Sequence, residues 1–189
     1  MASISLLALA ASAQIGLPQD EAASAPTSPP AGRAAAVAAP AGVYSGAAGS
    51  LAVTNPWVPE AEVDLDGRMS EEIWRKAALL TDFTQYEPVE GVAASQRTEV
   101  RVLVTDEAIY FGIRALDERD GVRSTLARRD SYGRSDDYVR LVLDTFGDQR
   151  RAFVFQVNPL GIQGDGLWVE GGGGWGDPID WNPDFLWYS

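Results

Sequence analysis

The residues best suited to chemistry in this sequence lie near its C-terminus, where tryptophans stand among carboxylates and amides. The stretch contains Trp168, Trp175 and Trp181, together with Asp177 and Asn182. A tryptophan ring stacks on the flat C–H face of a sugar, while Asp and Asn side chains bond its hydroxyl groups. Trp175 follows four glycines, which is typical of an exposed loop. The stretch therefore predicts a carbohydrate-binding site.

The same tryptophans have a structural interpretation. Trp168 and Trp187 would then be core residues, and Trp175 and Trp181 would pack on further chain beyond Ser189. The composition does not separate the two interpretations, since a large flat ring with one N–H donor suits both a core and a ligand platform.

Acidic residues near one predicted strand offer a second kind of site. Asp136 and Asp137 precede the strand and Asp144 follows it. Calcium prefers several carboxylate and carbonyl oxygens on a loop, so these three residues are the candidate calcium ligands. An acidic turn is the alternative explanation for such a run.

Catalysis by this chain alone is not predicted. The sequence contains no histidine and no cysteine, which excludes Ser-His-Asp triads, thiolate nucleophiles and zinc held by those residues. Glu87 and Glu90 flank a turn, and their spacing lacks the separation across a cleft that a glycosidase needs. The formal net charge of −12 argues against nucleic acid as a partner, because a phosphate backbone attracts a basic surface.

Short strands supply the framework for these residues. Alternating apolar and polar side chains predict two antiparallel hairpins, 99–104 with 109–116 and 138–144 with 152–157, and a further strand over 162–170. One short helix is predicted after Ser70 as N-cap, with Trp74 as its core anchor. Several strands and one minor helix indicate an all-β fold, an antiparallel β-sandwich.

The N-terminal part has a different composition. Residues 1–13 contain a short apolar run ending in Ala11-Ser12-Ala13, which predicts a signal peptide, although a basic start is missing and an Ala-rich disordered start is the alternative. Residues 14–56 are rich in Ala, Pro and Gly and predict a disordered linker. The folded domain is expected over 57–189, and no transmembrane helix is predicted.

Four blocks carry a resemblance to a known family. They occur in the order V-D-L-D-G-R-M-S-E-E-I-W-R-K-A, T-E-V-R-V-L-V-T-D-E-A-I-Y-F-G-I-R-A-L-D, S-D-D-Y-V-R-L-V-L-D-T-F and F-V-F-Q-V-N-P-L-G. In this order they resemble the carbohydrate-binding module family 9-like domain, over about Val58 to Ser189. The resemblance is to the version found at the N-terminus of bacterial secreted or outer-membrane proteins, ahead of a predicted β-barrel region.

The resemblance implies a β-sandwich that binds polysaccharide or glycan, is associated with enzymes that hydrolyse O-glycosyl bonds, and often carries structural calcium. It implies a secreted, periplasmic or outer-membrane location, with a β-barrel or enzyme domain linked downstream. Two features depart from the family: its closing strands are missing, which suggests a truncated fragment, and its sugar-clamping aromatic pair has no assigned counterpart. The alternative function is therefore a structural N-terminal domain of an outer-membrane β-barrel protein that does not bind sugar.

Overall fold

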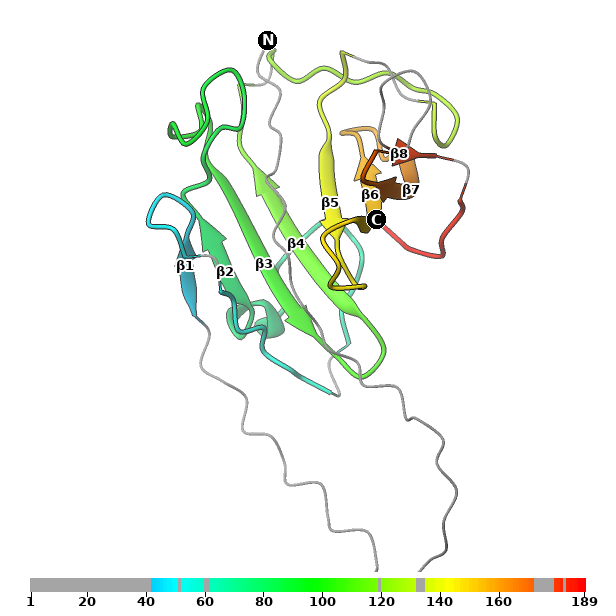
Figure 1. Ribbon diagram of the computed structural model, residues 1–189. Coiled ribbons are helices and arrows are strands. Elements are labelled where there is room, and N and C mark those ends of the chain that lie inside the picture. Colours follow the sequence, from blue (N-terminus) through cyan, green and yellow to red (C-terminus); the bar gives the residue numbers. More distant parts are fainter. Residues whose placement is uncertain are drawn as a thin grey trace, which may run out of the picture.

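The protein folds into two four-stranded β-sheets joined by loops, with one turn of helix (Figure 1). The computed structural model describes residues 42–50, 52–59, 62–118, 120–131, 135–171, 179–181 and 183–189. The predicted all-β fold is confirmed.

The first sheet has the strand order β1-β2-β3-β4. Its strands are β1 (Val43–Ser45), β2 (Ala78–Thr81), β3 (Thr98–Val104) and β4 (Ile109–Ala115). The predicted hairpin forms β3 and β4, which pair in antiparallel fashion from Thr98 opposite Ala115 to Val104 opposite Ile109. At the turn, Thr105 accepts hydrogen bonds from the backbone N–H groups of Glu107 and Ala108, so a side chain replaces the missing ladder bonds.

Both faces of the first sheet are covered by apolar side chains. One cluster of buried residues consists of Ala78, Leu80, Val100 and Val102. On the other face, Trp74, Ala77 and Leu103 form a second cluster. Trp74 is only 6 % exposed, which confirms it as a core anchor.

The predicted helix is shorter than expected and begins differently. Only Glu72–Arg75 is helical, as a 3₁₀ turn, and its N-cap is Glu71 without a side-chain capping bond. Ser70 as N-cap was therefore wrong. Ala78, directly after this turn and Lys76-Ala77, is the first residue of β2, because pairing with Val102 of β3 satisfies the backbone there more fully than a continued helix would.

Part of the described structure precedes the predicted boundary at residue 57. Strand β1 lies within the predicted linker 14–56 and pairs in parallel with β2, Val43 opposite Leu79 and Ser45 opposite Thr81. Tyr44 packs against the first cluster. A three-residue strand carries too little periodic pattern to be recognised in an Ala- and Gly-rich sequence, and only its partner strand defines it.

The second sheet has the order β5-β6-β7-β8 and is antiparallel throughout. Its strands are β5 (Val139–Leu143), β6 (Arg151–Val157), β7 (Gln163–Val169) and β8 (Ile179–Asp180). The second predicted hairpin and the predicted strand over 162–170 are thus confirmed. Because the register aligns Arg140 with Gln156, and Phe155 with Asp165, these two pairs lie on opposite faces of the sheet. We call them the Arg140 face and the Asp165 face.

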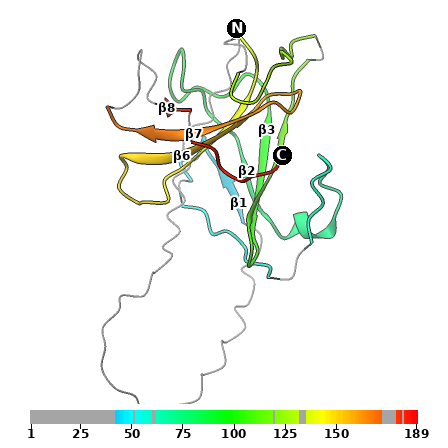
Figure 2. The same ribbon diagram turned by 90° about the vertical axis from the view of Figure 1, so that its right-hand side faces the viewer.

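Figure 2 shows β6 and β7 of the second sheet running across the direction of β3 in the first sheet. The strands of one sheet therefore do not continue those of the other. Within the described ranges, no helix combines the length and apolar character needed to cross a membrane.

Candidate functional site

The predicted sugar-binding residues are only partly placed by the structure. Trp175, Asp177 and Asn182 lie outside the described residues. Trp168 is half-buried in β7, opposite Ile179 of β8. Trp181 follows β8 directly and lies beside Arg140 of β5. Of the two candidates that the structure describes, Trp181 is therefore the one that lies in a mixed polar and aromatic cluster.

That cluster, which we call the Arg140 patch, consists of Tyr138, Arg140, Gln156 and Trp181. The Cζ atom of Arg140 lies 4.9 Å from the centroid of the Tyr138 ring and 5.6 Å from that of Trp181. These distances are typical of cation–π contacts. The guanidinium group thus contacts two rings, one from the residue directly before β5 and one from the residue directly after β8.

A buried amide fixes the orientation of the guanidinium. The Nε group of Arg140 donates a 2.7 Å hydrogen bond to Oε1 of Gln156, the residue directly opposite on β6. Gln156 is only 1 % exposed. A buried amide oxygen requires a donor, so the Gln156 side chain and the Arg140 side chain hold each other in place.

Glycine allows the segment after β7 to approach this face. A Cβ atom placed on Gly166 would lie 2.5 Å from the carbonyl oxygen of Asp180 and 2.9 Å from Cγ2 of Ile179. Real side chains do not reach such distances, so only glycine lets residues 179–181 lie this close to β7. This close approach carries Trp181 toward Arg140. The glycine at position 166, inside the predicted strand 162–170, is thus explained by the close approach of residues 179–181.

The opposite face carries a saturated ionic cluster. Asp165 is fully buried and accepts hydrogen bonds from Nη2 of Arg129, from the backbone N–H of Phe185 and, at 3.2 Å, from Nε1 of Trp187. Arg129 also pairs with Asp184 at 3.3 Å. Because every donor is matched, the cluster fastens residues 183–189 to the sheet.

Aromatic packing completes this attachment. The Phe185 ring lies 4.9 Å from that of Phe153 and 5.9 Å from that of Phe155, and Trp187 lies 5.4 Å from Phe155, all in edge-on arrangements. Ring pairs of this geometry stabilise beyond the area that they bury. Trp187 is therefore a packing residue, as its structural interpretation predicts.

Asp130 adds a titratable group beside Asp165. Its Oδ1 accepts a hydrogen bond from the backbone N–H of Asp165 at 3.1 Å. Burial raises the pKa of Asp130, and repulsion from the Asp165 carboxylate acts in the same direction, while the Asp165 N–H and Arg129 oppose both. The raised pKa means that ionising the Asp130 carboxyl costs more free energy in the folded state than in the unfolded state.

The three candidate calcium ligands accept hydrogen bonds from nearby backbone and side-chain groups instead of gathering around one point. Asp136 accepts hydrogen bonds from Thr125 N and Oγ1 and from Asn158 Nδ2. Asp144 accepts three from the backbone of the loop that joins β5 to β6. Asp137 accepts one from Arg123 N. Within the part of the chain that the structure describes, no group of three or more acidic residues is arranged to hold a metal ion.

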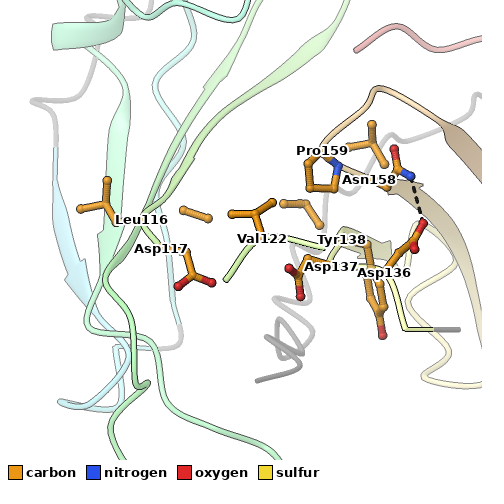
Figure 3. A pocket seen from close by; sticks show the side chains of 11 residues that line it. Leu116, Asp117, Val122, Asp136, Asp137, Tyr138, Asn158 and Pro159 are labelled. Carbon is orange, nitrogen blue, oxygen red and sulfur yellow. Dashed lines mark hydrogen bonds between the residues drawn. The ribbon is translucent and has the colours of Figure 1, made fainter. Parts of the chain in front are cut away.

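A pocket of about 300 Å³ lies between the end of β4 and the base of the β5–β6 hairpin (Figure 3). Leu116 and Asp117 directly follow β4, and Val122 comes from the loop beyond them. Asp137 precedes β5 and Pro159 follows β6. Figure 3 shows Asp136 pointing at Asn158 instead of into open space. The pocket is therefore mainly a gap between the two sheets. The hydrogen bonds of Asp136 to Thr125 and Asn158 hold one of its sides in place.

Comparison of the chain with protein-family models, with curated proteins and with solved structures found no match in any of the three. The functional argument therefore depends on the residues themselves.

Reasoning from the sequence missed three of the four residues of the Arg140 patch. Tyr138, Arg140 and Gln156 were assigned to strands, without a role. The available signal was Arg140 in the middle of an otherwise apolar strand, flanked by Val139 and Leu141. A charge at such a position must find a partner or a ligand, because burial of an unsatisfied charge is costly.

Proposed function

We propose that this chain binds carbohydrate without catalysing a reaction, and that the Arg140 patch is its binding surface. The observation that carries the proposal is the Arg140 guanidinium, held between the rings of Tyr138 and Trp181 and oriented by the buried Gln156 amide. Saccharides are recognised by this combination of aromatic faces and fixed hydrogen-bond donors.

The patch is built before any ligand arrives. Arg140 and Gln156 stand on paired strands, and Trp181 directly follows a strand. Groups fixed by secondary structure lose little conformational entropy on binding. This small loss supports recognition of a sugar, because a sugar offers little apolar surface to offset it.

The fold that accompanies this proposal is a β-sandwich of the carbohydrate-binding module family 9-like type. Two four-stranded sheets, antiparallel except for the β1–β2 pair, support it. In this role the chain would attach a linked domain, such as a glycoside hydrolase, to polysaccharide outside the cytoplasm, as a secreted, periplasmic or outer-membrane protein. Calcium remains a proposed accessory, which metal titration would detect.

The test is saccharide binding by the full chain, first on a glycan array and then by calorimetry with the best ligand. Trp181→Ala and Tyr138→Ala are each expected to lower the affinity by about tenfold, which corresponds to about 1.4 kcal/mol. Tyr86→Ala is the matched control, since Tyr86 is an exposed tyrosine in the loop between β2 and β3. Circular dichroism confirms that each variant is folded.

A folded chain that binds no saccharide would overturn the proposal. The chain would then be better explained as a structural N-terminal domain of an outer-membrane β-barrel protein. Binding that survives both patch variants would leave carbohydrate binding in place and move the site elsewhere.

A further inference from the structure

Arg140 differs from the other arginines in how its charge is compensated. Arg101, likewise partly buried, lies in the first sheet and pairs with Glu99 at 3.5 Å. Arg140 is half-buried, yet within the described ranges no carboxylate lies within ion-pair distance of it. The other described arginines that form no ion pair are exposed to solvent, namely Arg68, Arg114, Arg123 and Arg128.

This arrangement is unusual for a chain that carries 27 acidic residues. A partly desolvated guanidinium gains from an acidic partner, and carboxylates are abundant here. The sheet nevertheless places a neutral amide, Gln156, opposite Arg140. Among the described residues, no acidic side chain thus supplies a counter-charge to Arg140, which leaves room for one from a ligand.

The unused donors of Arg140 define what such a ligand must offer. A guanidinium has five N–H groups, and the bond to Gln156 uses the one on Nε. The four on Nη1 and Nη2 make no hydrogen bond to the residues that the structure describes, and they form a planar fork whose orientation is fixed by Gln156 and by the rings of Tyr138 and Trp181. Such a fork matches the two oxygens of a carboxylate, and the resulting charge-assisted bonds are about twice as strong as neutral ones.

We propose that the Arg140 patch selects acidic saccharides, with Arg140 binding the carboxylate of a uronic acid residue and the adjoining rings contacting the sugar. This inference rests on the proposed carbohydrate binding and narrows its ligand class. The net charge of −12 does not prevent it, because at physiological salt charges are screened beyond about 8 Å while a direct ion pair is not.

The experiment compares saccharides that differ only in the carboxylate, with the full chain in calorimetry. The probes are oligogalacturonate and the same oligomer as its methyl ester, and glucuronic acid against glucose. The native chain is expected to bind the acidic member of each pair at least about tenfold more tightly. Arg140→Gln is expected to remove this preference, because it should lower the affinity for the acidic member at least about tenfold more than the affinity for the neutral member.

Arg101→Gln is the matched control, because Arg101 is a partly buried strand arginine whose charge is already paired. It is expected to keep the preference. Arg140→Lys gives a second reading if Arg140→Gln folds poorly: it retains the charge but not the planar fork, and it should reduce the preference while preserving the fold.

Equal affinity for acidic and neutral members would overturn this inference and leave carbohydrate binding intact. Absence of binding to every saccharide would overturn carbohydrate binding and this inference together. An acidic preference that survives Arg140→Gln would also overturn it, because the carboxylate would then be recognised by another group.

Discussion

The two faces of the second sheet each hold an arginine, and the two are treated in opposite ways. On the Asp165 face, Arg129 lies within 4 Å of three carboxylates and its cluster is closed over by residues 183–189. On the Arg140 face, the guanidinium contacts two rings and one amide and no described carboxylate. An arginine side chain against the same sheet thus serves attachment on one face, where Arg129 comes from the segment before β5, and is prepared for a ligand on the other, where Arg140 belongs to β5.

This contrast shows how a binding residue can be distinguished from a structural one. A structural charge in a protein interior is saturated by its own chain, because an unpaired buried ion is expensive. A charge kept partly buried, oriented and incompletely paired costs stability that folding alone does not recover. Such a group is therefore a candidate for function.

The largest expected effect is on the saturated face. Asp165→Ala removes the acceptor of Arg129, Phe185 N–H and Trp187 Nε1, and it should lower the free energy of unfolding by about 3 kcal/mol. Asp184→Ala removes an exposed partner of the same arginine and should cost no more than about 0.5 kcal/mol. Urea denaturation measures both. Similar losses in the two variants would show that the buried cluster is not what holds residues 183–189.

An intermediate effect is expected where the chain crosses the other face. Gly166→Ala places a methyl group 2.5 Å from the Asp180 carbonyl oxygen, which must push residues 179–181 away from β7. The expected cost is about 1–3 kcal/mol, and saccharide affinity should fall because Trp181 moves with this segment.

Gly121→Ala is the matched control for that substitution. Gly121 lies in a loop, and a Cβ there would lie 3.1 Å from the exposed Asp117 carboxylate and 3.2 Å from the backbone oxygen of Glu118, which is less close than the 2.5 Å contact at Gly166. Gly121→Ala should lower the free energy of unfolding less than Gly166→Ala does, and it should leave the affinity unchanged. If Gly166→Ala changed neither quantity more than Gly121→Ala, the close approach of residues 179–181 would not be what positions the patch.

The smallest expected effect is a pH dependence within the saturated cluster. Because the pKa of Asp130 is raised above its usual 3.8, the folded state binds this proton more tightly than the unfolded state does. The free energy of unfolding therefore loses a contribution as the pH rises from about 3.8 through the folded-state pKa.

Asp130→Asn removes that loss and retains an acceptor for the Asp165 N–H. The variant should be slightly more stable than the native chain at pH 7, and the difference should shrink toward pH 3. Thermal melts across this range measure it. A difference that does not change with pH would show that the carboxylate is not the source.

The strand framework was readable from the sequence. Alternation over Thr98–Val104, Ile109–Ala115 and Arg151–Val157 located three of the longest strands, because a strand half-buried on one face carries a local period of two. Trp74 was assigned to the core for a similar reason. The short elements were not readable: β1 is defined only by pairing with β2, and Ala78 lies in a strand because Val102 of β3 pairs with it.

The candidate site was determined by tertiary structure. Trp181 was selected from its residue type, whereas Arg140 and Gln156 became significant only when the register placed them opposite each other. Gly166 then allowed residues 179–181 to lie close to β7, which brought Trp181 to a strand some forty positions earlier in the chain. Residue types and local periodicity are properties of the sequence alone, but register and close approach depend on contacts between distant segments, and these decide which side chains share a surface.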